Sequence, residues 1–139
     1  MPKHTASLVV KGIEKLHKCV ETARVTVLGA GYKGECGDVR NSPSKKVVRN
    51  LLSLGAKVTI FDPYSHEGFG AKVAEDLYQA IADADCTVIL TDHSLFKKLD
   101  LKKVKRLMSS QPLIIDGRLL VKPEEARGLG FLYFGVGIS

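Results

Sequence analysis

The apolar positions at the start of the chain repeat with the period of a helix. Val9, Ile13, Leu16 and Val20 are spaced three and four residues apart, and lysines stand between them. On a helix this spacing gathers the apolar side chains along one face and the charged ones along the other. The pattern predicts an amphipathic helix over residues 4–20.

After that helix the pattern changes to short, continuous apolar runs that are rich in β-branched residues. Runs of this kind, each stopped by a glycine or a polar residue, are typical of strands buried on both faces of a parallel sheet. Five segments have the pattern: residues 25–28, 58–61, 87–90, 113–115 and 131–134. Helical spacing occupies the stretches between them, at residues 43–54, 74–83, 95–108 and 123–127.

Strands that alternate with helices in this way predict one α/β fold. A chain of 139 residues has the usual length of one domain. We expect a single doubly wound, Rossmann-like domain of three layers, with a mostly parallel five-stranded sheet and an extra N-terminal helix. If the five strands stand in the order 3-2-1-4-5, the ligand crevice lies between the first and the fourth strand. The loops that begin at Gly29 and Asp116 would then face each other.

Glycines follow the first predicted strand with the G-x-G-x-x-G spacing of a dinucleotide-binding loop. They are Gly29, Gly31 and Gly34. Asp62 ends the second strand, where such folds place an acid that binds ribose. In that motif, however, a helix begins inside the glycine loop. Here Ser42-Pro43 is the strong helix start, and a helix begun earlier would carry Pro43 in its interior at a cost of about 3 kcal/mol. We therefore expect an elongated loop over residues 29–41 that can fold over a phosphorylated ligand, with NAD binding by this loop as the alternative.

The charge distribution adds a second alternative. Lys and Arg outnumber Asp and Glu by 21 to 15, a net charge of +6, which suits polyanionic partners. Six of the cations stand in one short stretch: Lys97, Lys98, Lys102, Lys103, Lys105 and Arg106. Leucines and Val104 between them supply an apolar face. We interpret the cluster as the solvated face of a helix, and a nucleic-acid-binding patch is the other interpretation.

The cysteines and the hydropathy bear on the compartment. Cys19, Cys36 and Cys86 have no CxxC or Cys/His ligand spacing, so we expect reduced thiols and no zinc site. No apolar run approaches the about 18 residues of a membrane helix, and the first residues do not form a signal-peptide core. We interpret the protein as cytoplasmic.

One segment, Asp92-His93-Ser94, combines the residue types of a catalytic triad. Neighbours in sequence rarely converge on one reacting atom, so this segment predicts a helix N-cap at Asp92 or Ser94 instead. The other histidines lack ligand spacing, and we expect neither a catalytic residue nor a metal ligand in this chain.

Several motifs in order along the chain resemble one family. Gly31-Tyr32-Lys33 is followed by Gly37-Asp38-Val39-Arg40-Asn41-Ser42-Pro43, and Phe61-Asp62-Pro63-Tyr64 ends the second strand. Further along stand Thr91-Asp92-His93 and Asp116-Gly117-Arg118. Together they resemble the C-terminal UDP-binding domain of the UDP-glucose/GDP-mannose dehydrogenase family, and the resemblance extends over almost the whole chain.

The resemblance implies roles for individual residues. Tyr32 and Lys33 match the aromatic-lysine pair that contacts the nucleotide sugar, and Arg118 matches a second substrate contact. Asp38 is grouped with these substrate-binding residues as a carboxylate that orders the loop by pairing with Lys33 or Arg40. Arg40 matches an arginine that helps to hold NAD. Cationic groups beside a pyrophosphate form charge-assisted hydrogen bonds, so these roles are physically sensible.

The resemblance also implies a larger enzyme. It would oxidise the C6 hydroxyl of UDP-glucose or a UDP-N-acetylhexosamine to a carboxylate in two NAD-dependent steps, for polysaccharide biosynthesis. In that enzyme residues 1–22 are the helix that links a central region to residues 23–139, the UDP-binding domain. We expect the NAD-binding domain, the central region and the catalytic cysteine to lie outside this chain, the parent enzyme to be a homo-oligomer, and the fragment to be inactive alone. A stand-alone NAD-binding regulatory module and a basic nucleic-acid-binding protein are the alternatives.

Overall fold

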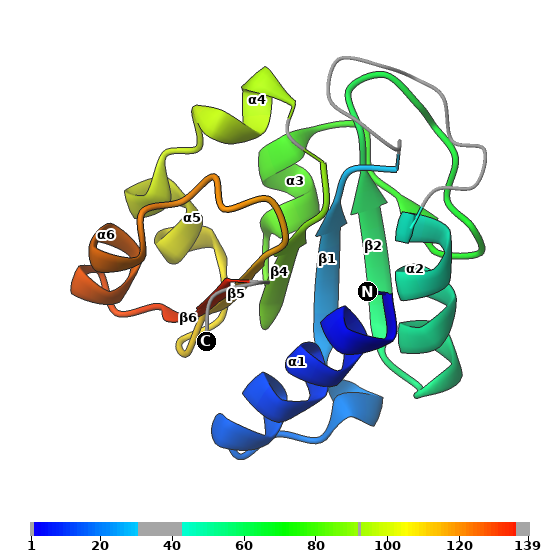
Figure 1. Ribbon diagram of the computed structural model, residues 1–139, viewed down its shortest axis with the longest axis horizontal. Helices are drawn as coiled ribbons and strands as arrows, with labels where there is room; N and C mark the ends of the chain where they lie inside the picture. Colours follow the sequence, from blue (N-terminus) through cyan, green and yellow to red (C-terminus); the bar gives the residue numbers. More distant parts are fainter. Residues whose placement is uncertain (1, 31–42, 92, 136–139) are drawn as a thin grey trace.

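Six parallel strands form one sheet at the centre of the computed structural model, which describes residues 2–30, 43–91 and 93–135 (Figure 1). Neighbouring strands are hydrogen-bonded in the order β3-β2-β1-β4-β5-β6, and each neighbouring pair is parallel. In that order the strands are β3 (Lys72–Val73), β2 (Lys57–Phe61), β1 (Arg24–Leu28), β4 (Cys86–Ile89), β5 (Leu113–Asp116) and β6 (Leu132–Gly135).

The α/β fold class and the five expected strands are confirmed, but the sheet has a sixth strand, and two of the four expected strand pairings are wrong. The sequence pattern missed β3, because two residues are too few to have a recognisable period. This strand occupies the outer edge of β2, with Thr59 opposite Lys72. In the expected order 3-2-1-4-5 it takes the third place, so the 87–90 strand is the fourth and pairs with β1 as β4, where the 113–115 strand was expected. The strand order reverses between β1 and β4, which places the crevice of such folds between these two strands.

Helices cover both faces of the sheet and complete the three layers (Figure 1). One face is covered by α1 (Pro2–Lys15) and α2 (Pro43–Ser53). The other face packs against four shorter helices: α3 (Leu77–Ile81), α4 (Ser94–Lys97), α5 (Leu101–Leu107) and α6 (Pro123–Gly128). In the described part of the chain, no helix is both long and apolar enough to cross a membrane.

Helix positions agree with the sequence pattern, but three expected helices are shorter or divided. The helix expected over residues 74–83 spans only Leu77–Ile81, as α3. The helix expected over residues 4–20 ends at Lys15, and a short 3-10 turn, η1 (Val20–Thr22), precedes β1. The helix expected over 95–108 is interrupted before Asp100, whose carboxylate accepts hydrogen bonds from the amides of Lys102 and Lys103 and so begins α5. A side chain of this type competes with the helix interior for backbone donors, which is why it starts a new helix.

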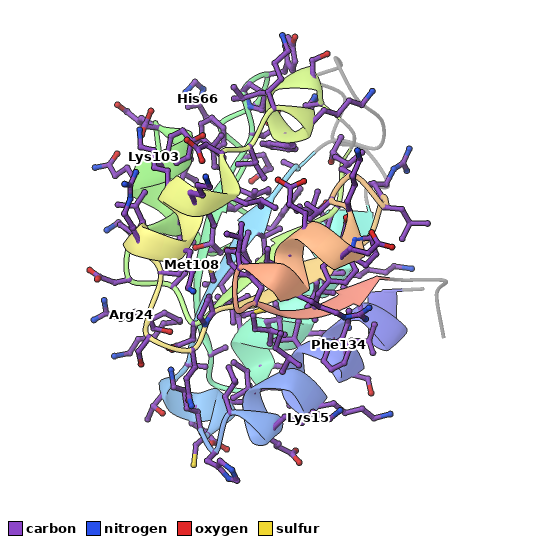
Figure 2. All side chains as sticks on the ribbon, turned by 90° about the vertical axis from the view of Figure 1, so that its left-hand side faces the viewer. Lys15, Arg24, His66, Lys103, Met108 and Phe134 are labelled. Carbon is purple, nitrogen blue, oxygen red and sulfur yellow. The ribbon has the colours of Figure 1, made fainter. Side chains whose placement is uncertain are left out.

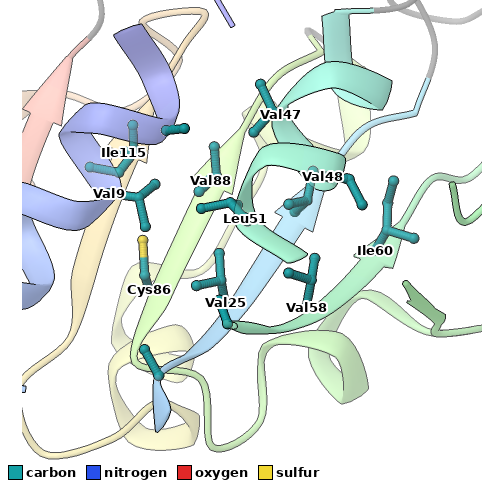
Figure 3. Close-up of a cluster of buried hydrophobic side chains, with 14 of the residues drawn as sticks. Val9, Val25, Val47, Val48, Leu51, Val58, Ile60, Cys86, Val88 and Ile115 are labelled. Carbon is teal, nitrogen blue, oxygen red and sulfur yellow. The ribbon is translucent and has the colours of Figure 1, made fainter. Parts of the chain in front are cut away.

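The strands are apolar on both sides because each face of the sheet is covered by a hydrophobic core, and the first of these lies under α1 and α2. Val25 and Val58 point from β1 and β2 toward Val48 and Leu51 of α2, and the Cys86 thiol lies on β4 in the same cluster (Figure 3). Val9 and Ile13 of α1 are fully buried in this cluster too. The N-terminal helix, which the sequence pattern predicts only as an addition to the α/β fold, therefore packs into the core of the domain.

An ion pair between Lys18 and Asp85 holds the segment after α1 against the amino ends of the strands. Lys18 Nζ lies 2.7 Å from Oδ1 of Asp85, and the Arg24 amide donates to Oδ2 of the same carboxylate. Burial opposes ionisation of this carboxyl, but hydrogen bonds from Lys18, Arg24 and Ser109 outweigh it and lower the pKa of Asp85.

The crevice edge of β1 depends on a residue without a side chain. Gly29 follows β1 with φ of 110°, and a β-carbon there would lie 2.6 Å from Cβ of the buried Thr91, which follows β4. Its amide donates to the Phe61 carbonyl of β2. The first glycine of the motif therefore allows the ends of β1 and β4 to approach closely.

We predict that Gly29→Ala destabilises the protein by about 2–4 kcal/mol, because alanine combines an unfavourable φ with a clash that its surroundings cannot relieve. Urea unfolding measures the loss. Gly128→Ala is the control: no atom stands within 4 Å of a β-carbon at Gly128, so the substitution should be neutral or slightly stabilising. Equal stability of the two variants would contradict the close contact between Gly29 and Thr91.

Candidate functional site

Four loops meet at the carboxyl edge of the sheet, after β1, β2, β4 and β5. The sequence placed most of its site residues in the first of these, and Tyr32, Lys33, Asp38 and Arg40 all lie outside the described residues. Arg118 is described: it is exposed and stands in the loop after β5. Because β4 stands between β1 and β5, the expectation that the loops starting at Gly29 and Asp116 directly face each other is wrong.

A buried carboxylate joins three of the strand ends. Asp62, directly after β2, accepts at Oδ2 a hydrogen bond of 2.7 Å from the Ala30 amide, which follows β1. Its Oδ1 accepts one of 2.7 Å from the Tyr64 amide. Nε2 of His93, in the loop after β4, lies 2.9 Å from the same Oδ2, and since a carboxylate only accepts, the imidazole donates. The side chains of Asp62 and His93 are 1% and 0% exposed, so this contact is fixed inside the protein.

Aromatic rings enclose the imidazole of His93. The ring of Tyr64 lies 5.1 Å from it, and Phe96 of α4 meets it edge-on at 5.3 Å. His93 itself stands at the N-cap position of α4, so the expected N-cap at Ser94 is wrong, and Asp92 lies outside the described residues. The sequence pattern does not identify this histidine as a partner of Asp62. The sequence shows an acid after one strand and a histidine after another. The pair can be expected to meet only when β2 and β4 are known to lie on either side of β1.

The Asp62 contacts decide how the glycine motif is interpreted. In a dinucleotide-binding fold the acid at this position is presented to a ribose. Asp62 is instead buried and accepts hydrogen bonds from Ala30, Tyr64 and His93. The described residues therefore do not fit NAD in the usual position of such folds, and the carboxylate has a structural role.

A second buried carboxylate holds the loop that contains Arg118. Asp116, the last residue of β5, is 0% exposed. Its Oδ1 accepts a hydrogen bond of 3.1 Å from the Arg118 amide, and its Oδ2 accepts one of 2.7 Å from the Val121 amide. The hydroxyl of Tyr133, on β6, lies 3.0 Å from the same Oδ2. Burial raises the pKa of Tyr133, and the Asp116 charge and hydrogen bond raise it further, so the phenol keeps its proton as a donor.

The same loop is constrained at two more positions. The Gly117 amide donates to the Ile89 carbonyl of β4 at 2.7 Å, and a β-carbon at Gly117 would lie only 2.7 Å from that oxygen. Leu119 has φ of 57°, a left-handed conformation that costs a leucine roughly 1–2 kcal/mol, and its side chain is 49% exposed. Backbone strain of this kind persists only where surrounding contacts enforce it. Arg118 therefore projects from a backbone fixed on both sides.

Charged features elsewhere on the molecule lie apart from this edge. Arg24, Lys57 and Lys72 line a groove of about 700 Å³ at the amino half of β1, β2 and β3. In Figure 2, Arg24 lies well below His66, which follows β2. In the cation cluster, Lys103 of α5 lies 4.1 Å above the Tyr78 ring, and its charged neighbours are exposed, as expected for the solvated face of a helix (Figure 2).

The described cysteines do not offer a reactive thiolate at the carboxyl edge. Cys86 is fully buried in β4, and burial, with the nearby Asp85 charge, raises the pKa of its thiol well above the usual range. Cys19 is exposed but precedes β1, at the amino edge. Cys36 lies outside the described residues. Within those residues no group of three His, Cys, Asp or Glu side chains could hold a metal ion.

Known proteins with a similar sequence are nucleotide-sugar dehydrogenases. Residues 26–123 match the model of the UDP-glucose/GDP-mannose dehydrogenase family, UDP binding domain. The chain is 37% identical over 124 residues to a UDP-glucose 6-dehydrogenase of Bacillus subtilis, covering 85% of this chain and 27% of that enzyme. It is 33% identical over 137 residues to a UDP-N-acetyl-D-mannosamine dehydrogenase of Pyrococcus horikoshii, covering 99% of this chain and 31% of that enzyme.

A solved structure agrees with these relationships. The crystal structure of an NDP-N-acetyl-D-galactosaminuronic acid dehydrogenase from Methanosarcina mazei superposes with a TM-score of 0.93 at 34% identity. The match covers 99% of this chain and 29% of that one. The chain thus spans less than a third of the length of each of these three relatives.

We predict that Asp62→Asn destabilises the protein by about 2–4 kcal/mol. Donors face both oxygens of Asp62, and an amide group in its place would direct its own NH2 at one of them and leave it unpaired. Thermal or urea unfolding measures the change. Asp76→Asn is the matched control, because Asp76 caps α3 through a single exposed hydrogen bond to Gln79 and asparagine caps helices equally well. If Asp62→Asn unfolds like the control, the carboxylate does not hold the strand ends together.

Proposed function

Because the chain belongs to the UDP-glucose/GDP-mannose dehydrogenase family, we propose that it binds the UDP part of a nucleotide sugar for an NAD-dependent 6-dehydrogenase. The observation that carries the proposal is the family match over residues 26–123, which includes both the glycine loop and the Arg118 loop. The geometry supports it, since the carboxyl edge of a doubly wound sheet is where such folds bind phosphorylated ligands.

The proposed substrate contacts come from the two loops that flank the end of β4. Arg118 presents a guanidinium from a backbone that Asp116 fixes, which suits bidentate hydrogen bonds to a diphosphate. Tyr32 and Lys33 are proposed to contact the nucleotide sugar from the glycine loop, and Asp38 to order that loop.

We propose that NAD is bound mainly by another domain of the parent enzyme, with Arg40 as the contribution of this chain. The buried, hydrogen-bonded state of Asp62 supports this division, because the acid that would bind the cofactor ribose has a structural role here. The same observation disfavours a stand-alone NAD-binding module.

The parent enzyme is proposed to oxidise the sugar C6 hydroxyl to a carboxylate, with UDP-glucose or a UDP-N-acetylhexosamine as substrate. Relatives of both kinds support this range. Residues 1–22 are proposed to connect this domain to a central region and residues 23–139 to form the UDP-binding domain, within a homo-oligomer. Packing of Val9 and Ile13 into the core makes α1 part of the domain as well as a connection.

Binding of UDP by the chain tests the proposal. Calorimetric titration should give saturable UDP binding that Arg118→Ala weakens about 10- to 100-fold and Lys33→Ala about tenfold, through loss of charge-assisted hydrogen bonds to phosphate. Arg106→Ala removes an exposed cation of α5 and should leave the affinity unchanged. NAD and an oligonucleotide, titrated in parallel, should bind more weakly than UDP.

Two other results would favour the alternatives. NAD binding that is tighter than UDP binding would indicate a cofactor module. Oligonucleotide binding that falls steeply with salt, without any response to UDP, would indicate a nucleic-acid-binding protein.

We further predict that the chain alone does not reduce NAD in the presence of UDP-glucose or UDP-N-acetyl-D-mannosamine, because neither described cysteine is placed to form a covalent intermediate at the carboxyl edge. The NADH absorbance assay, run beside a full-length relative, measures this. Any turnover by the chain alone would contradict this prediction, and serine replacement of each of the three cysteines would then show whether one of them is the nucleophile.

A further inference from the structure

One of the hydrogen-bond donors to Asp116 is a buried side chain on a different element from the Arg118 loop. Tyr133 belongs to β6, at the edge of the sheet, and is 3% exposed. Its hydroxyl lies 3.0 Å from Oδ2 of Asp116 and 3.2 Å from the Val121 carbonyl. A ligand at the surface therefore cannot touch this hydroxyl, and any effect of it on binding must pass through Asp116 or Val121.

These two residues bracket Arg118 in the loop. Asp116 accepts from the Arg118 amide on one side and from the Val121 amide on the other. Between them Leu119 is held in a left-handed conformation. Removal of a donor from Oδ2 would leave the carboxylate freer to turn, and the strained backbone at Leu119 would then be freer to relax.

The ring of Tyr133 provides the rigidity that this arrangement needs. It is buried against the α6 side of the sheet, and the Arg127 guanidinium of α6 lies 5.8 Å from its centre. In a parallel sheet the position of β6 is set by its hydrogen bonds to β5, with Tyr133 opposite Ile114. The hydroxyl is thus presented to Asp116 from a fixed position.

We propose that Tyr133 is a positioning residue for Arg118: its hydroxyl fixes the Asp116 carboxylate, which fixes the Arg118 backbone and thereby raises the affinity for the diphosphate of a nucleotide sugar. The inference rests on the proposed function, in which Arg118 contacts that diphosphate. It assigns to a buried residue of an edge strand a contribution to ligand binding that stability alone would not reveal.

A double-mutant cycle tests the inference. UDP affinity is measured for the wild-type chain, Tyr133→Phe, Arg118→Ala and the double variant, at a temperature where unfolding curves show all four to be folded. Phenylalanine keeps the ring and removes the hydroxyl. We expect Tyr133→Phe to weaken UDP binding about three- to tenfold, the effect of one hydrogen bond, and the double variant to bind like Arg118→Ala alone. A residue that only stabilises the fold would not give this complete loss of effect in the Arg118→Ala background.

Tyr78→Phe is the matched control for the hydroxyl. Tyr78 lies on α3, and its oxygen accepts a hydrogen bond from the Asp100 amide, away from the Arg118 loop. Its removal should leave UDP affinity unchanged. If Tyr133→Phe does not fold, Leu119→Gly is the second variant: it relieves the left-handed strain, so it should fold at least as well while weakening UDP binding three- to tenfold, again only when Arg118 is present.

Wild-type affinity in Tyr133→Phe overturns the inference, and so does a loss that persists in the Arg118→Ala background. If Tyr133→Phe does not fold, the same two results in Leu119→Gly overturn it. An unchanged affinity in Arg118→Ala also overturns it while leaving UDP binding by the chain in place. Absence of UDP binding by the wild-type chain would instead remove the proposed function, and this inference with it.

Discussion

Buried carboxylates need donors, and this requirement organises the whole carboxyl edge of the sheet. Asp62 after β2 and Asp116 at the end of β5 are almost completely inaccessible to solvent. Among the described residues, two backbone amides and one side chain donate to each carboxylate, and the side chain is His93 for Asp62 and Tyr133 for Asp116. An unpaired charge at either position would cost several kcal/mol, so the loops that supply the donors are held to the strands.

Both carboxylates accept hydrogen bonds in a buried position, but they fix different parts of the carboxyl edge. Asp62 joins β1, β2 and the loop after β4, and in doing so it fills the position from which an acid would bind a cofactor ribose. Asp116 leaves its loop at the surface, with Arg118 projecting from it. One carboxylate thus removes a dinucleotide contact from a familiar glycine motif, while the other fixes the backbone of Arg118, the cation proposed to contact the diphosphate. This asymmetry supports the proposal that the domain binds the nucleotide of the substrate and that another domain binds most of the cofactor.

Several cations outside the candidate site have local partners. Lys18 is paired with Asp85, and Lys15 of α1 lies 5.2 Å from the centre of the Phe134 ring on β6 (Figure 2). On α5, Lys103 lies over Tyr78. These three cations have partners within the fold, so the net charge of the chain counts cations that serve its structure as well as any that bind a ligand.

The sequence by itself determined where the helices lie, though not all of their ends, as well as five of the strands and the family. Each of these depends on patterns within short segments: period 3.6, buried apolar runs, and motifs such as Asp116-Gly117-Arg118. It could not supply β3, since two residues have no period, and without β3 it gave β1 the wrong neighbour. Tertiary structure alone brought His93 to Asp62 and Tyr133 to Asp116, pairs that lie 31 and 17 residues apart along the chain. A carboxylate at a strand end looks the same in sequence whether it faces a ligand or a buried donor. Only the order of the strands decides which groups lie opposite it, because hydrogen bonds depend on distances in space.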